Sequence, residues 1–357
     1  MKALVLAGGR GSRLRPLSHT APKQLVPVAN RPAIFYGLEA LRDVDIKQVV
    51  IIVGQHGGRV ERAVGSGSRF GLEVTYLPQR SPIGLADCVR IASDVLGNDD
   101  FVMYPGDCVI PDGIEGLVRR FWAQRPDALA MVSGVPRPSP YGVAHTDEAG
   151  ALLEIRDTAR TPHYSYPVIG PHVFSPAIHQ AVVSIRPSWR GELDIGDAVQ
   201  WLVDHRYPVA VDVHAGAWCH TGDVDGLLEC NRTLLMSLQP RIFGKVDDAT
   251  EVRGPVVVEL GATVSGSKLT GPLVIGADTV VVNSRLGPYT AIGDDCVLEG
   301  ARIEDSIVLD GAWISASEPI HGSVIGASAQ VHAAAPPRPG ARLVIGDHCR
   351  VHLVSSS

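Results

Sequence analysis

The sequence predicts an α/β fold, a Rossmann-like and mostly parallel sheet, followed by a left-handed parallel β-helix of hexapeptide repeats. Up to about residue 215, short β-branched runs alternate with amphipathic segments, which is the pattern of parallel strands connected by helices. From about residue 252 the chain is rich in Val, Ile and Gly, and apolar residues recur at six-residue spacing. The 357 residues suffice for two domains, which we expect at residues 1–240 and 241–357.

The alternation in the first domain is assigned run by run. The expected strands are KALVLA (2–7), QVVIIVG (48–54), EVTYLP (73–78), DFVMYPGD (100–107), ALAMVSGV (128–135) and YPVAVDVH (207–214). The expected helices are AIFYGLEALRDV (33–44), GLADCVRIASDVL (84–96), IEGLVRRFW (114–122) and, last before the pattern changes, VDGLLECNRTLLMSL (224–238). Open parallel sheets bind ligands outside the carboxyl ends of their strands, and the loop at residues 8–16 takes that position.

The repeat in the second domain is the basis for the β-helix. Val280, Leu286, Ile292 and Leu298 follow one another at six-residue intervals, and Ile-Gly or Leu-Gly pairs recur through the region. This spacing is typical of a parallel β-helix, in which each short strand stacks on the coil below. The alternative is a β-sandwich with many glycine turns, which should instead alternate with period two. The insertion HAAAPPRPGAR (332–342) interrupts the repeat, and we expect a surface loop there.

Composition and charge exclude several classes of protein. The formal net charge of −6 argues against a basic surface for nucleic acid. The six cysteines form no CxxC pair, so we expect neither a disulfide framework nor a structural zinc site. This use of cysteine fits a reducing compartment. A strand-like run directly follows Met1, and no apolar run is long enough to cross a bilayer. We expect a soluble cytoplasmic protein that binds neither nucleic acid nor membrane.

The segment at residues 6–32, LAGGRGSRLRPLSHTAPKQLVPVANRP, is locally cationic in an acidic chain. It holds five Arg or Lys side chains and no carboxylate, and its glycines follow a predicted strand. Glycines permit positive φ and let backbone N–H groups approach phosphate oxygens, while Arg13 and Lys23 neutralise the remaining charge. The segment matches neither the Rossmann fingerprint nor the P-loop. The alternative is a tight surface turn with solvated arginines.

Two further segments add candidate ligands. In VMYPGDCVI, Asp107 follows a buried strand, and a carboxylate facing a phosphate loop is placed to hold Mg²⁺. Its alternative is the role of a turn or N-cap aspartate. In LPQRSPIGLADCV, Gln79 is placed to read a base edge, and Gly84 lets the backbone approach the ring.

Several stretches resemble the sugar-1-phosphate nucleotidyltransferases, in order along nearly the whole chain. LAGGRGSRLRPLSHTAPKQLVPVANRPAIFYGLEAL (6–41) is similar to the signature of that family. Three further stretches resemble the glucose-1-phosphate thymidylyltransferases in particular: VMYPGDCVI (102–110), PSWRGELDIGDAVQWL (187–202) and WCHTGDVDGLLECNR (218–232). The β-helix, ending RLVIGDHCRVHL (342–353), resembles the long form of that family.

The resemblance implies roles on the nucleotide side of the site. Gly8, Gly9 and Gly11 are implied to line a nucleoside triphosphate through backbone contacts. Arg13 and Lys23 are the implied catalytic residues, which stabilise charge at the α-phosphorus and on the leaving pyrophosphate. The implied reaction is an in-line attack of a sugar-phosphate oxygen, without a covalent enzyme intermediate.

The resemblance also implies roles for the base, the sugar and the metal. Gln79 and Gly84 are implied to hold a pyrimidine base, and Gly142 is implied to meet the sugar. Asp107 is the implied ligand of Mg²⁺, and Asp157 stands where the family has a sugar-binding Glu.

Three positions depart from the family pattern. Thr158 replaces a Lys that touches the sugar phosphate, and Cys108 replaces an Asn next to the metal-binding Asp. His220 stands where a second carboxylate ligand is expected. Imidazole suits Mn²⁺ or Co²⁺ better than Mg²⁺, so we expect the site to prefer Mn²⁺ or Co²⁺ to Mg²⁺.

We expect an enzyme that transfers a nucleotidyl group from a nucleoside triphosphate, dTTP by the resemblance, to a sugar or cyclitol 1-phosphate. The products are pyrophosphate and a nucleotide sugar. The alternative is a catalytically impaired regulator of the same fold that binds a nucleotide or sugar nucleotide, because the substituted positions cluster at the second substrate. β-Helices stack and assemble, so we also expect a homo-oligomer.

Overall fold

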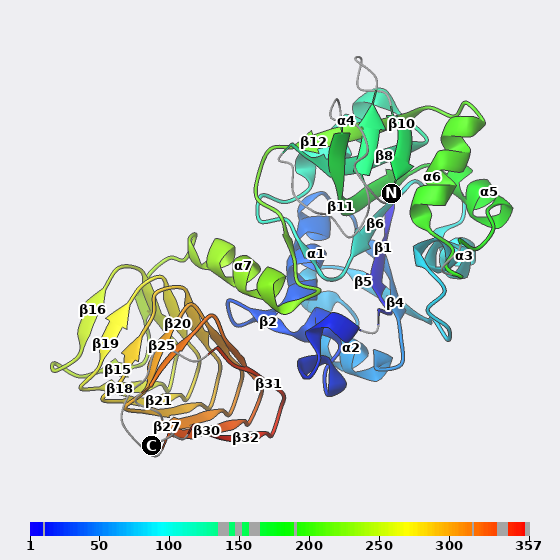
Figure 1. The fold of residues 1–357 in the computed structure, drawn as a ribbon. Coiled ribbons are helices and arrows are strands. Elements are labelled where there is room, and N and C mark those ends of the chain that lie inside the picture. Colours follow the sequence, from blue (N-terminus) through cyan, green and yellow to red (C-terminus); the bar gives the residue numbers. More distant parts are fainter. Residues whose placement is uncertain are drawn as a thin grey trace. The chain divides into compact units, whose positions relative to one another are not determined.

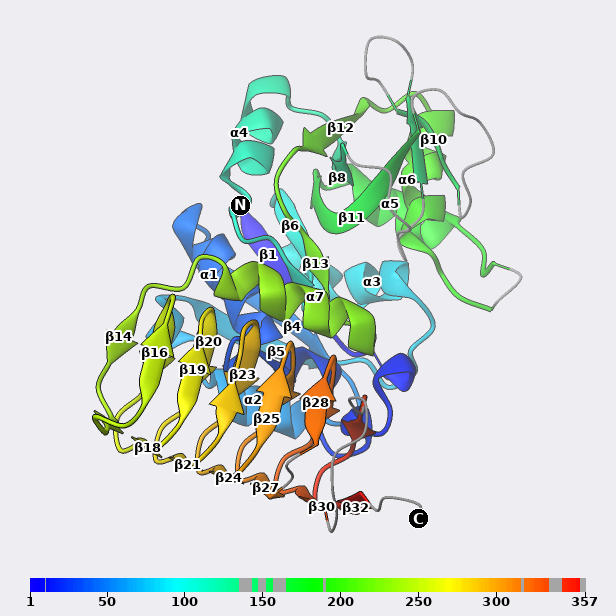
Figure 2. The same cartoon turned by 60° about the vertical axis from the view of Figure 1, so that its left-hand side comes forward.

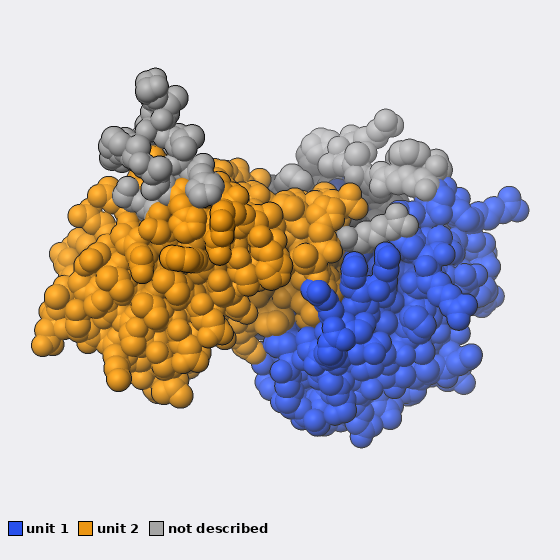
Figure 3. Space-filling view, turned by 90° about the horizontal axis from the view of Figure 1, so that it is seen from below, with its two compact units in different colours: residues 1–10, 34–218 blue, residues 11–33, 219–357 orange. Residues whose placement is uncertain are grey.

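The computed structural model describes residues 1–9, 11–134, 143–146, 152–156, 165–188, 191–315, 318–333 and 342–353. The chain forms two compact units (Figure 3). The first consists of Met1–Arg10 and Ile34–Trp218, and the second of Gly11–Ala33 and Cys219–Ser357. Compact units are defined by packing and not by function, so the expected boundary at residue 240 stays a prediction. In the part of the chain that the structure describes, no helix is long and apolar enough to span a membrane.

A mixed sheet forms the centre of the first unit, and its parallel half contains the strands predicted near the N-terminus (Figure 1). β1 (Lys2–Ala7) pairs in parallel with β4 (Gln48–Val53) and β6 (Phe101–Pro105), and β5 (Glu73–Pro78) continues in parallel beyond β4. The other strands are β11 (Ser165–Phe174), antiparallel to β6, then β8 (Ala128–Ser133), β12 (Val209–His214), β9 (Val143–Thr146) and β10 (Leu152–Arg156). All six strands expected from the sequence are present.

Helices cover both faces of this sheet. Leu4, Leu6 and Met103 lie on the face covered by α3 (Leu85–Leu96), α5 (Ala177–Ser184) and α6 (Ile195–Asp204). On the other face, Gly37 of α1 (Ala33–Asp43) lies so close to the Tyr104 ring that an added Cβ would stand 2.8 Å from it. The remaining helices are α2 (Gly57–Val64) and α4 (Glu115–Gln124). The sequence predicted α1, α3 and α4 but not the other three.

Three parallel sheets form the β-helix of the second unit, which confirms the predicted fold class (Figure 2). The first contains β14 (Arg241–Ile242), β17 (Val256–Val258), β20 (Leu273–Ile275), β23 (Thr290–Ile292), β26 (Ile307–Val308), β29 (Val324–Ile325) and β31 (Val344–Ile345). The second contains β15 (Lys245–Val246), β18 (Thr263–Ser265), β21 (Val280–Val282), β24 (Val297–Glu299), β27 (Trp313–Ser315), β30 (Gln330–Ala333) and β32 (Arg350–Leu353). The third contains β16 (Glu251–Arg253), β19 (Lys268–Thr270), β22 (Arg285–Leu286), β25 (Arg302–Glu304) and β28 (Pro319–His321).

The side chains that point into the β-helix differ by one position from the strict six-residue period. Val281 is fully buried, whereas Val280, the residue that the period selects, is 38% exposed. The inward residues Ile275, Val281, Leu286 and Ile292 are therefore separated by six, five and six positions. One side of the coil is a residue shorter than the others, so an uninterrupted six-residue count selects the wrong neighbour there.

Buried hydroxyl groups connect successive coils at the corners. Ser267 Oγ accepts a hydrogen bond of 3.0 Å from the Ser284 N–H, and Ser284 Oγ accepts one of 3.0 Å from the Ala301 N–H. Thr279 Oγ1 accepts in the same way from the Cys296 N–H at 3.0 Å. Corner N–H groups without a ladder partner are thereby satisfied, and small polar residues fit where an apolar side chain could not pair them. Cys296 is buried, and burial raises the pKa of its thiol to about 12.

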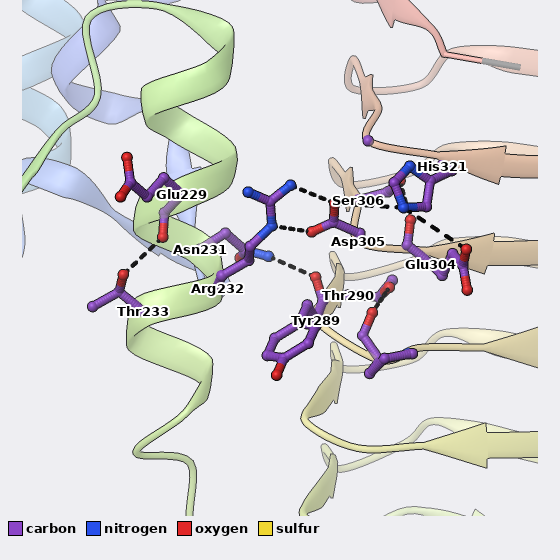
Figure 4. A network of polar contacts seen from close by, with 12 residues as sticks. Glu229, Asn231, Arg232, Thr233, Tyr289, Thr290, Glu304, Asp305, Ser306 and His321 are labelled. Carbon is purple, nitrogen blue, oxygen red and sulfur yellow. Dashed lines mark hydrogen bonds and ion pairs between the residues drawn. The ribbon is translucent and has the colours of Figure 1, made fainter.

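The helix α7 (Val224–Leu235) lies alongside the coils in the second unit (Figure 4). Its N-cap residue Asp223 accepts a hydrogen bond of 2.8 Å from the Gly226 N–H. Further along, the Arg232 guanidinium forms a two-pronged ion pair with the Asp305 carboxylate at a corner of the β-helix. This pairing raises the pKa of Arg232 and fixes the helix in register with the coils.

A buried histidine lies in the sheet of the first unit. His172 of β11 is 3% exposed, and its ring stacks on Phe174 with centroids 5.5 Å apart. Its Nδ1 is 2.6 Å from the Gly170 carbonyl oxygen, which makes Nδ1 the protonated nitrogen of a neutral ring. Burial lowers the pKa of His172 to about 4.

We expect His172 to make the fold sensitive to acid. The unfolded chain takes up a proton near pH 6.5 and the folded chain only near pH 4, so the stability it contributes is complete above 6.5 and lost as pH falls to 4. The loss is roughly 3 kcal/mol. His172→Asn keeps the donor to Gly170, and its unfolding free energy in urea should decline less between these pH values. His56→Asn, at an exposed histidine, should leave the decline unchanged. Parallel declines in the wild type and His172→Asn would contradict this role.

Candidate active site

In the first unit, the structure brings together three of the residues predicted to bind the nucleotide. Gly8 and Gly9 follow β1, and Gln79 follows β5, so they lie at the carboxyl edge of the parallel strands. An ideal Cβ on Gly8 would stand 2.8 Å from Gln79 Oε1. The Gln79 side-chain oxygen therefore lies against Gly8, and a residue with a Cβ at this position would displace it.

Gly84 precedes α3 and is required there by its backbone. Its φ is +119°, and an added Cβ would stand 2.1 Å from the Leu193 carbonyl oxygen. That oxygen accepts a hydrogen bond of 3.1 Å from the Ala86 N–H, and the Leu193 N–H donates to the Ile83 carbonyl at 2.6 Å. Only glycine fits here, because any side chain would collide with the main chain of Leu193. The Gly84 carbonyl also lies 3.3 Å from Gln79 Nε2.

Two residues near Gln79 were missed by the sequence analysis. Asp87 of α3 is 3% exposed, and its Oδ2 accepts a hydrogen bond of 3.2 Å from Gln79 Nε2. Its Oδ1 is held by Arg90, whose terminal nitrogen is 2.6 Å away. The Asp-x-x-Arg spacing on one helix face was the available signal. It was overlooked because an acid in the first turn of a helix is common without any ligand.

The cysteine beside this cluster is not a nucleophile. Burial, with the Asp87 charge as the second cause, raises the pKa of Cys88 to about 12. The thiol therefore stays protonated at neutral pH, and the thiolate that nucleophilic catalysis needs is not formed. This agrees with a reaction that needs no covalent enzyme intermediate.

In the second unit, Gly11 and Lys23 lie against each other. Gly11 has φ +63°, and an added Cβ would stand 3.2 Å from the Lys23 Cβ. The Gly11 carbonyl accepts a hydrogen bond of 2.6 Å from Ser18 Oγ, which closes the segment into a compact turn. Arg13, in the short 3-10 helix Ser12–Leu14, is exposed, and Lys23 is half-buried. The Arg13 side chain is thus open to solvent, whereas the Lys23 side chain packs against Gly11 near its Cβ.

The β-helix holds the segment that carries these two cations. Thr20 Oγ1 donates to the Asp347 carboxylate, and Asn30 Nδ2 donates to the Ile292 carbonyl at 2.5 Å. The Ala29 N–H donates to Asn231 Oδ1 at 2.9 Å. The segment and the β-helix are far apart in the sequence, and no local pattern predicts these contacts.

Asp107, the predicted metal ligand, is buried in a turn, and its role toward a metal stays a prediction. It lies in the turn between β6 and β7 (Cys108–Val109) and is 4% exposed. Among the residues that the structure describes, no group of three His, Cys, Asp or Glu side chains is arranged to hold a metal ion. A single buried carboxylate fits a hard cation that takes its other ligands from substrate phosphates and water.

His220, the second candidate ligand, lies in β13 (Cys219–His220) and packs over a glycine. An added Cβ on Gly222 would stand 2.0 Å from the ring Cε1. The Gly222 N–H donates to His220 Nδ1 at 3.3 Å, near the long limit for such a bond. This contact uses the Nδ1 lone pair, so a metal taking Nδ1 replaces only a weak hydrogen bond.

The remaining predicted site residues lie outside the described part of the chain. They are Gly142 and Asp157, together with the substituted position Thr158. Their roles toward the sugar phosphate stay predictions.

Comparison with known proteins identifies the family. The model of the nucleotidyl transferase family matches residues 2–237. The chain belongs to this family. It is 51% identical over 355 residues to glucose-1-phosphate thymidylyltransferase of Streptomyces griseus, covering 99% of this chain and 100% of the relative. It is 47% identical over 356 residues to the enzyme of that name from Streptomyces antibioticus, covering 99% of this chain and 100% of that relative.

Solved structures of nucleotidyltransferases share the fold. A structure described as a putative glucose-1-phosphate thymidylyltransferase of Bacillus anthracis superposes with a TM-score of 0.61 at 32% identity, over 69% of this chain and 98% of that one. A UDP-glucose pyrophosphorylase superposes with a TM-score of 0.59 at 20% identity, over 66% and 98%, and shows the fold alone. The full-length matches confirm the resemblance to the long form and the prediction of a nucleotidyltransferase enzyme. They do not favour a non-catalytic regulator.

We expect the contact between Thr20 and Asp347 to support binding of a nucleoside triphosphate. Thr20→Val removes the donor at nearly constant volume, and Asp347→Asn removes the acceptor but keeps Oδ1, which accepts from the Ala327 N–H at 2.8 Å. Each change should weaken triphosphate binding about fivefold in calorimetry, the loss of about one hydrogen bond.

The double variant distinguishes this contact from general damage. Because both changes break the same bond, Thr20→Val with Asp347→Asn should bind no more weakly than either single variant. Thr250→Val is the matched control, since its hydroxyl donates to Asp247 at 2.6 Å and touches no part of residues 11–33. Additive losses, or an equal loss in Thr250→Val, would contradict the proposed support.

Proposed function

We propose that the enzyme transfers the thymidylyl group of dTTP to a sugar 1-phosphate, with glucose 1-phosphate as the first substrate to test. The full-length similarity to two glucose-1-phosphate thymidylyltransferases carries this proposal. The arrangement of Gly8, Gln79 and Gly84 supports it, because it holds an amide that suits a base edge at the carboxyl edge of the parallel strands.

The reaction proposed is an in-line attack of a phosphate oxygen of the sugar 1-phosphate on the α-phosphorus of dTTP. The bond from that phosphorus to the bridging oxygen breaks, and pyrophosphate leaves with its electron pair. Backbone N–H groups of Gly8, Gly9 and Gly11 bind phosphate oxygens, and Arg13 and Lys23 stabilise the charge that grows on the leaving group. Since both nucleophile and leaving group are already anionic, positioning and charge neutralisation supply most of the acceleration.

A divalent cation is proposed at Asp107. When bound, it supplies positive charge to the triphosphate oxygens and helps to orient them. Asp107 holds the cation through its buried carboxylate, and His220 is the proposed second ligand. Toward the sugar, we propose Gly142 and Asp157.

The proposed partners are a nucleoside triphosphate and a sugar or cyclitol 1-phosphate. The residues proposed for chemistry all precede residue 225, and the β-helix is proposed to assemble copies of the chain into a homo-oligomer. We propose the cytoplasm as the location, because both substrates are intracellular metabolites.

We expect release of pyrophosphate from dTTP and glucose 1-phosphate, and a loss of activity in Lys23→Ala. Removing one group that stabilises the developing charge should lower kcat/KM about 10²-fold. Lys47→Ala is the control, because Lys47 is exposed and its ammonium pairs only loosely, at 3.7 Å, with the exposed Asp45 carboxylate. If wild type releases no pyrophosphate with any sugar 1-phosphate and any of dTTP, UTP, dCTP or ATP, the proposed function is wrong.

The metal preference tests His220. With imidazole in place of a carboxylate, we expect Mn²⁺ or Co²⁺ to support faster turnover than Mg²⁺ at equal concentration, and a chelator to stop it. His220→Asp should shift the preference toward Mg²⁺, and His220→Ala should lower turnover with every ion. An unchanged order of metals in His220→Asp would remove His220 from the ligand set. The exposed His348→Asp serves as the control for added charge.

A further inference from the structure

The Gln79 amide has only one chemically acceptable orientation. Its nitrogen lies 3.2 Å from Asp87 Oδ2 and 3.3 Å from the Gly84 carbonyl oxygen. Both neighbours are acceptors only, so they must face the NH₂ group. Turning the amide by 180° would bring Oε1 against two oxygens and leave the buried Asp87 oxygen without a donor.

Asp87 is itself held in place. Arg90 reaches its Oδ1 through two nitrogens, at 2.6 Å and 3.2 Å, and the Asp87 side chain is almost completely buried. A carboxylate that is paired with a guanidinium accepts hydrogen bonds and has no hydrogen to donate. The orientation of Gln79 is thus set by a group that cannot change its own hydrogen-bonding character.

The consequence is an acceptor of fixed position beside Gly8. Oε1 lies 2.8 Å from the position of an ideal Cβ on Gly8, so it lies against the main chain that follows β1. Within the described residues, it accepts no hydrogen bond, while both hydrogens of the amide nitrogen are engaged. A ligand that reaches Gln79 therefore meets a fixed acceptor.

We propose that Asp87 is a positioning residue that sets base specificity, by fixing Gln79 Oε1 as an acceptor for a ring N–H. Thymine and uracil carry a hydrogen on N3, whereas N3 of cytosine is an acceptor and is repelled by Oε1. The inference rests on the proposed function, and it names the feature of the nucleotide that this site selects: a pyrimidine with a donor at N3. When cytosine is bound, the acceptor Oε1 finds no hydrogen on N3 and stays unpaired, and a site with such an unpaired polar group discriminates strongly against that base.

The test compares dTTP, dUTP and dCTP in the wild type and in Asp87→Asn. The amide that this substitution introduces offers both a donor and an acceptor at the same volume. Only the Gly84 carbonyl oxygen then opposes a turn of the Gln79 amide, so the turned form, which presents its NH₂ group to N3 of cytosine, becomes populated. We expect wild type to prefer dTTP and dUTP over dCTP in kcat/KM. In Asp87→Asn, that preference should fall at least tenfold, a change of about one hydrogen bond in discrimination. The rate with dCTP should rise in absolute terms, which damage to the site cannot produce.

Two further variants guard the interpretation. Asp94→Asn alters an exposed aspartate on the same helix and should leave the preference unchanged. Arg90→Gln removes the cation from a side chain that is 54% exposed and leaves an amide that can still donate to Asp87, and it should reduce the preference by a smaller factor in the same direction. This variant keeps the test informative if Asp87→Asn does not fold.

The outcomes separate the inference from the function beneath it. Absence of turnover with every nucleotide in the wild type contradicts the proposed function. Turnover in the wild type with dCTP equal to dTTP overturns the inference alone, because Oε1 then meets an exocyclic amino group. A preference for dTTP that persists in both Asp87→Asn and Arg90→Gln also overturns it.

Discussion

The second unit depends on one buried amide. Asn231 of α7 is fully buried, and its Nδ2 donates to the Tyr289 carbonyl of the β-helix at 3.1 Å while its Oδ1 accepts from the Ala29 N–H at 2.9 Å. Three pieces of chain far apart in sequence meet at this side chain. An apolar residue of similar size would leave two main-chain groups without partners, at a cost of about 1–3 kcal/mol for each that stays dry.

This amide gives the second unit a role in positioning the segment at residues 11–33. The segment at residues 11–33 contains only three short 3-10 helices and the two-residue strands β2 (Pro27–Val28) and β3 (Arg31–Pro32). Such a segment buries too little surface to fix its own conformation. Its contacts with α7, Ile292 and Asp347 hold the segment in place, which is what the proposed catalytic roles of Arg13 and Lys23 require, since a displacement of about 1 Å costs much of the rate.

Sequence patterns predicted the parts of this structure that local periodicity determines. The strands at residues 2–7 and 48–53 and the coils of the β-helix follow from alternation and repeat spacing, and Gln79 and Gly84 follow from a turn that opens onto a helix. The patterns failed where a long-range contact decides. Val281 faces inward in place of Val280 because the coil is one residue short on one side. The support of residues 11–33 by Asn231 and Asp347 joins positions about 200 and 330 residues away, which no local window includes.

Asp87 shows why a site residue escapes a reading based on residue type. Its carboxylate touches no proposed substrate, and its contribution is a constraint on a neighbour: it removes one of the two orientations of an amide. An asparagine would fill the same volume, yet it would leave the Gly84 carbonyl as the only group that opposes the other orientation. Because the Asp87 carboxylate only accepts hydrogen bonds, whereas an amide also donates them, the residue at position 87 determines which pyrimidine base Gln79 favours. Burying the Asp87 carboxylate costs desolvation free energy. Arg90 offsets part of that cost, and because its side chain is 54% exposed, the cation itself needs little desolvation.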